Sequence, residues 1–179
     1  MRRAVVASIV LALASAAAPA RQRPDITPPP PPPENFVPVT EADVLARLPD
    51  RERALVASET APRDRFERYV EISDLRLDDV GARLDAQAAS VVEPLLLYEA
   101  VIRVADQLLR SKEARVPPRD KRFKRFERRL GKQIALLESM VAEMSYEDSP
   151  TGAAVLATAK RLKAAALNSA LDVDILEAP

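Results

Sequence analysis

Apolar side chains recur at spacings of three and four residues along most of this chain, as they do on one face of an α-helix. Four long segments show this spacing, separated by prolines or short polar joints: 62–90, 94–111, 119–145 and 149–171. Two shorter segments precede them, 40–48 and 51–58. Hardly any stretch alternates as a strand does, so we predict an all-α protein, an antiparallel helical bundle of about four long helices plus two short N-terminal helices. A solenoid of helix hairpins is the alternative, but no fixed sequence period links the segments.

The apolar faces of the four long segments differ in width. In 62–90, Ile72 and Leu75 project away from the main apolar face, which predicts a second contact face. In 94–111 the apolar stripe spans about 160°, which predicts the central and most buried helix. Solvent is expected on its opposite, charged side, which carries Glu99, Arg103, Asp106 and Arg110.

The residues that begin the helices follow known preferences. Thr40 is a predicted helix cap, with Asp43 in the first turn, and Ser149 is a predicted cap that is followed by Pro150. These signals bound a predicted helical domain over residues 40–171, followed by an acidic C-terminal tail, 172–179.

The first forty residues differ in composition from this domain. Residues 1–20 combine two arginines, an apolar run and small residues, which predicts a signal peptide cleaved before Arg21. An uncleaved anchor is the alternative, although the run is short and rich in alanine for a membrane span. Residues 21–39 hold six consecutive prolines and form a predicted proline-rich linker, either a polyproline II spacer or a disordered tail. We therefore expect a periplasmic or secreted protein with no transmembrane span after cleavage.

The composition removes most familiar catalytic chemistry. The chain has no His and no Cys, so it offers no imidazole base, thiol nucleophile, disulfide or His/Cys zinc site. Its three glycines are far apart, which excludes a glycine-rich phosphate loop. The acidic groups match neither a di-iron nor a calcium pattern. We therefore predict no catalytic residue, no cofactor and no metal site, and a protein that is not an enzyme.

Charge is balanced overall, with 27 basic and 27 acidic side chains, but one segment departs from that balance. Residues 112–132 contain ten Lys or Arg and three acidic residues, a net charge of +7. Six of these cations share one side of the predicted helix, opposite its apolar stripe: Lys121, Lys124, Arg125, Arg128, Arg129 and Lys132. Such a face attracts anionic partners, although an ordinary solvated helix face is the simpler explanation.

Phe123 and Phe126 stand among these cations, an arrangement also found in proteins that stack on single-stranded nucleic acid. Both fall on the apolar side of the helix, so we predict core positions and no nucleic-acid partner.

The favoured function is a structural or interaction protein of the cell envelope, which contacts an envelope protein, an acidic polymer or a lipid headgroup through the basic face. Homo-oligomerisation is left open. The alternatives are a carrier or holdase that takes apolar cargo between helices around Leu96, Leu97 and Val104, and, last, a carboxylate-dependent enzyme.

Overall fold

A computed structural model describes residues 39–88 and 90–172, all within one unit of the chain, residues 33–179. The predicted signal peptide, the predicted linker up to residue 38 and the predicted tail beyond Asp172 lie outside the described residues. The described part of the chain contains six helices and no strand, which confirms the all-α prediction. The helices are α1 (Glu41–Arg47), α2 (Asp50–Ala57), α3 (Pro62–Asp85), α4 (Val92–Arg110), α5 (Lys121–Glu143) and α6 (Ser149–Leu171).

Local chemistry explains where the helices begin. Thr40 caps α1, as predicted, and Asp43 completes a reciprocal capping box with it. The Asp120 carboxylate caps α5 by accepting a hydrogen bond from the backbone N–H of Arg122 at 2.8 Å. For α6 the prediction was one residue off, because Asp148 is the N-cap and Ser149 is already helical.

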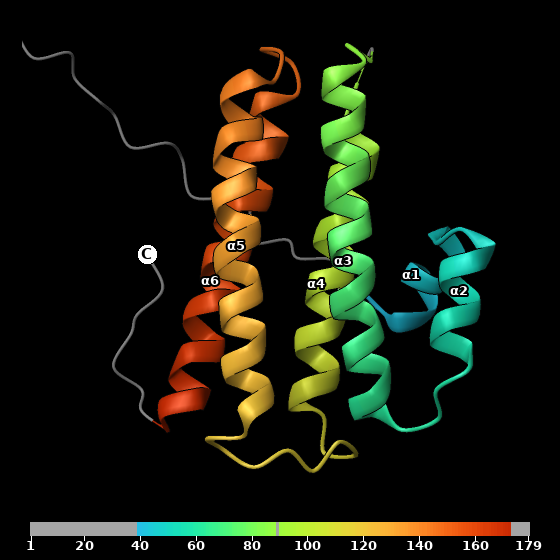
Figure 1. Ribbon diagram of the computed structural model, residues 1–179, viewed down its shortest axis with the longest axis vertical. Helices are drawn as coiled ribbons and strands as arrows, with labels where there is room; N and C mark the ends of the chain where they lie inside the picture. Colours follow the sequence, from blue (N-terminus) through green and yellow to red (C-terminus); the bar gives the residue numbers. More distant parts are fainter. Residues whose placement is uncertain (1–38, 89, 173–179) are drawn as a thin grey trace, which may run out of the picture. The chain divides into compact units, whose positions relative to one another are not determined.

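The long helices pack in pairs, and the chain reverses direction from each one to the next (Figure 1). α3 packs on α4, α5 packs on α6, and α4 joins the two pairs by contacting α6. α1 packs on α4 and α2 on α3, at the side away from α5 (Figure 1). α3 and α5 also touch each other, and the seam between them carries the site described below.

α4 is the most buried helix, as its wide apolar stripe predicts. Leu97 and Val104 both belong to the core. The expectation that the charged side of α4 faces solvent holds for Arg110 but fails for Glu99 and Asp106, because α6 covers part of that side. Glu99 accepts a hydrogen bond from Thr158 of α6, and the Asp106 side chain is only 13% exposed. Burial raises the pKa of Asp106, and its ion pair with Arg110 opposes that shift.

Of the two residues predicted to form a second contact face on α3, one is buried. The helix also ends earlier than predicted. Ile72 is fully buried, whereas Leu75 is 43% exposed. The helix stops at Asp85, not Ser90, because Gln87 adopts a left-handed conformation with φ of 51°. The backbone N–H groups of Gln87 and Ala88 donate to the carbonyls of Leu84 and Arg83, which closes a Schellman motif.

Candidate functional site

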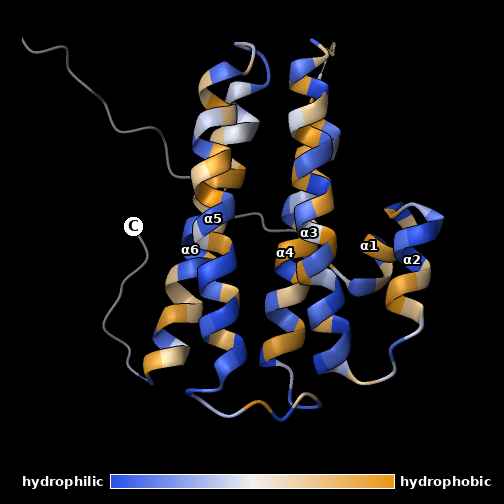
Figure 2. Ribbon diagram, viewed as in Figure 1, coloured by the Kyte–Doolittle hydropathy of each residue, from blue (hydrophilic) through white to orange (hydrophobic). Residues whose placement is uncertain are grey.

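The N-terminal half of α5 carries the predicted basic face. The helix forms because buried residues recur at helical spacing, among them Phe123, Phe126 and Leu130. Both phenylalanines are in the core, as predicted, and Phe126 meets Phe66 of α3 edge to face. All six predicted cations are exposed on the opposite side, where the ribbon of α5 is largely hydrophilic (Figure 2).

The structure brings these six cations to one groove between α3 and α5. The groove has a volume of about 540 Å³. Its wall on α5 consists of the six predicted cations, Lys121, Lys124, Arg125, Arg128, Arg129 and Lys132. Its wall on α3 consists of Glu67, Val70 and Glu71. Six cations and two carboxylates leave the lining with a net charge of +4.

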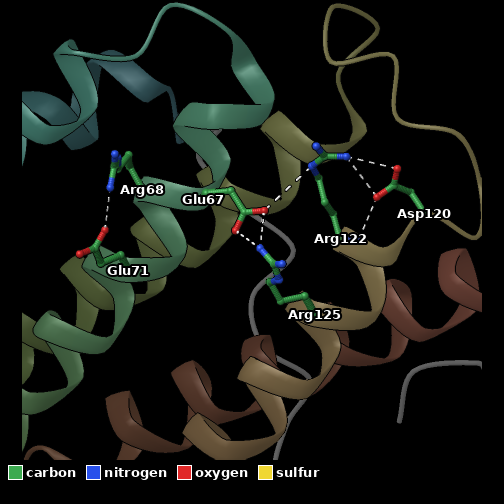
Figure 3. Close-up of polar contacts among 6 residues, drawn as sticks. All are labelled: Glu67, Arg68, Glu71, Asp120, Arg122 and Arg125. Carbon is green, nitrogen blue, oxygen red and sulfur yellow. Dashed lines mark hydrogen bonds and ion pairs between the residues drawn. The ribbon is translucent and has the colours of Figure 1, made fainter.

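Two of the six cations bridge the seam to α3. Arg125 donates to both carboxylate oxygens of Glu67 at 2.9 Å, and Arg129 bonds to Asp74 (Figure 3 shows the first pair). Exposed ion pairs of this kind contribute at most about 1 kcal/mol each. They nevertheless occupy these two guanidinium groups, so Arg125 and Arg129 help to join the helices across the seam.

The other four cations make no ion pair with any described residue, and we call them the cationic stripe: Lys121, Lys124, Arg128 and Lys132. Successive members are three or four residues apart, so at about 100° per residue they fall within about 80° of one another around α5. No described residue accepts a hydrogen bond from their ammonium and guanidinium groups. An anion that enters the groove therefore meets four cations without displacing a carboxylate.

Further arginines contact the two carboxylates of the α3 wall, Glu67 and Glu71, which we call the acidic wall. Arg122 bonds to Asp120 and reaches Glu67 at 4.0 Å, so Glu67 lies between two arginines of α5 (Figure 3). Glu71 interacts with Arg68 at 3.2 Å through one carboxylate oxygen (Figure 3). Each carboxylate has about four lone-pair sites, so these contacts saturate neither Glu67 nor Glu71.

Beneath the seam a buried polar network ties three helices together. Gln133 of α5 accepts a hydrogen bond from the Tyr98 hydroxyl of α4 at 3.0 Å. Its amide N–H₂ donates to Ser73 at 2.7 Å and to Asp74 at 2.9 Å, both on α3. Burial, and secondarily the charge of Asp74, raises the pKa of Tyr98, so its hydroxyl remains a donor. Asp74 thus links the core network to Arg129 in the groove.

The acidic residues near the start of α6 serve the fold. The Asp148 carboxylate accepts hydrogen bonds from the Ser90 hydroxyl at 3.1 Å and from the backbone N–H of Val91 at 3.2 Å. It thereby holds the α3–α4 connection against the start of α6. Over the described ranges, no group of three or more carboxylates is placed to hold a metal ion.

The sequence prediction found the basic wall of the groove but missed the α3 wall. Glu67 and Glu71 are four residues apart, so helical periodicity places them on the same side of their own helix. This is the only sequence signal for the α3 wall. That signal does not say which neighbouring helix they face.

Comparisons with protein-family models, with curated proteins and with solved structures find no match for this chain. Among the described residues, none of the helices combines the length and apolar character needed to cross a bilayer.

Proposed function

We propose that this chain is an exported, non-enzymatic interaction protein of the cell envelope that binds an anionic partner in the α3–α5 groove. In this proposal the long helices form an antiparallel bundle, and the proline-rich segment joins it to a signal peptide that is removed. The bundle is favoured by the reversal of chain direction between successive long helices and by the packing of α4 against α6.

The single observation that carries the proposal is the cationic stripe in a concave surface. Four exposed cations that form no ion pair within the described ranges lie along one groove, while their neighbours Arg125 and Arg129 are paired with α3. A groove lined by one sign of charge focuses the electrostatic field and raises the local concentration of anions. Because the groups are exposed, binding should weaken as ionic strength rises.

A carrier or holdase for apolar cargo is the second candidate, and the core packing weighs against it. Leu97 and Val104 are buried in the core. Cargo could reach them only if the helices parted. Leu96 is 40% exposed and so offers a single apolar side chain at the surface, which is ordinary for a soluble domain.

The test compares two double variants of the full chain that change the net charge equally. Lys124→Glu with Arg128→Glu alters the cationic stripe. Lys112→Glu with Arg115→Glu is the control, since both are exposed residues of the same basic sequence run but lie outside the groove. Reversing Arg125 or Arg129 would be less informative, because it would also break the ion pairs to α3.

The probes represent three anionic surfaces: vesicles containing an anionic lipid, polyglutamate and polygalacturonate. The proposal expects at least one probe to bind at low salt, to lose affinity with the groove variant and to keep most of it with the control. Equal loss with both variants, or no binding of any probe, would overturn it. Circular dichroism should show unchanged helicity in both variants.

A further inference from the structure

The cationic stripe is long and narrow. From Lys121 to Lys132 the helix rises by eleven residue steps, or about 16.5 Å at 1.5 Å per step. Its steps are about 4.5 to 6 Å, since successive members are three or four residues apart. A compact anion such as one phosphate would reach only one or two of these cations. The spacing therefore suits an extended polymer with one negative charge per repeat unit.

The opposite wall of the groove adds a second requirement. Glu67 and Glu71 line the groove, and neither carboxylate is saturated by its contacts with arginine. These two carboxylates add no attraction for a ligand that carries only negative charge. A ligand that also carries hydroxyl groups can donate hydrogen bonds to the two carboxylates while its own charges lie on the cationic stripe.

We propose that the groove binds an extended acidic polysaccharide whose repeat unit is a uronate sugar. Each sugar ring carries one carboxylate for the cationic stripe and hydroxyl groups for Glu67 and Glu71, and a ring is comparable in length to one step of the stripe. This inference rests on the proposed function, because it identifies the anionic partner of the same groove.

Other anionic partners fit the groove less well. An acidic helix carries carboxylates for the cationic stripe but brings few hydroxyl groups to Glu67 and Glu71. A lipid surface is usually engaged with apolar side chains that insert beside the cations, whereas the only apolar lining residue, Val70, is buried. Single-stranded nucleic acid is bound with stacked aromatic rings, and none lines the groove.

The first test measures, by isothermal titration calorimetry at low salt, how tightly the full chain binds oligogalacturonates of one to eight units. An exposed ion pair contributes a factor of up to about five in affinity, so going from two to four units should raise the affinity by up to about 25-fold. Affinity should then change little beyond the four or so units that span the stripe. A fully methyl-esterified oligomer, which keeps the hydroxyls and loses the charges, should not bind.

The second test separates the acidic wall from simple charge attraction. Glu71→Ala removes a negative charge and an acceptor. Polyglutamate has no hydroxyls, so it should bind the variant more tightly, whereas the octagalacturonate loses a hydrogen bond. The affinity for octagalacturonate relative to polyglutamate should therefore fall.

The results distinguish this inference from the function on which it rests. If oligogalacturonates fail to bind while vesicles or polyglutamate bind through the cationic stripe, the polysaccharide inference is overturned and the proposed function stands. The inference is also wrong if affinity does not depend on oligomer length, or if Glu71→Ala leaves the affinity ratio unchanged. If no probe binds, both fall.

Discussion

Replacing Gln133 by leucine tests how the seam beneath the groove is held together. Gln133 is buried and connects Tyr98 of α4 to Ser73 and Asp74 of α3. Leucine has a similar size but can neither donate nor accept a hydrogen bond. The substitution therefore removes three hydrogen bonds while nearly preserving the packing.

The expected loss follows from which groups remain without a partner. The buried Tyr98 hydroxyl would lose its acceptor, which costs about 1 to 3 kcal/mol. Asp74 would lose a hydrogen bond, but its side chain is 26% exposed and can turn to water, so its share is smaller. Ser73 still donates to the backbone carbonyl of Val70 at 2.7 Å. The sum is a loss of about 2 to 4 kcal/mol in the free energy of unfolding.

Urea unfolding, followed by circular dichroism, measures this loss in Gln133→Leu, Tyr98→Phe and the double variant. Because the double variant removes both partners of one hydrogen bond, it should be more stable than the sum of the single losses predicts, by about 1 kcal/mol. The reasoning is refuted if Gln133→Leu lies within about 0.5 kcal/mol of the unsubstituted protein, or if the two losses simply add.

Three further substitutions test burial and close packing. Burial raises the pKa of Asp106 above its ordinary 3.8, so the folded state binds its proton more tightly than the unfolded state. This contribution to stability is present at low pH and is lost as the pH rises through the folded pKa. When the pH is lowered from 7 to 4, the unsubstituted protein should therefore gain stability relative to Asp106→Asn. A relative gain by the variant would mean that the ion pair with Arg110 dominates. Gly131→Ala should raise the free energy of unfolding by up to about 1 kcal/mol, because the new methyl group meets only Lys163 at 3.5 Å. Gly152→Ala should lower the free energy of unfolding by about 1 kcal/mol or more, since the methyl group would lie 2.9 Å from Val141. Thermal or urea unfolding compares the two glycine variants, and a more stable Gly152→Ala would contradict the packing argument.

Much of the fold could be predicted because helical signals are local. The apolar spacing of α5 identified Phe123 and Phe126 as core residues, and the stripe of α4 identified that helix as the most buried. Thr40 could be predicted as the cap of α1 because it lies within one turn of Asp43, which completes the capping box. Each of these features depends on residues at most a few turns apart.

Features that depend on other helices escaped prediction. The charged side of α4 looked like a solvent face, but Thr158 of α6 hydrogen-bonds to Glu99 there. α3 ends at Asp85 through a left-handed Gln87, whereas such a position usually carries Gly or Asn. In both cases the deciding contact or conformation leaves no mark in the periodic pattern.

The basic groove combines both kinds of information. Periodicity placed six cations on one side of α5, yet it could not show that α3 divides them into two groups. Arg125 and Arg129 lie towards α3 and pair with Glu67 and Asp74, so they hold the seam, while the cationic stripe is left for a ligand. The two groups therefore predict different responses to charge reversal: a change in Arg129 should lower stability and binding together, whereas a change in Lys124 should lower binding alone. Measuring both properties on the same variants decides whether the basic face is a binding surface or only a solvated side of the helix.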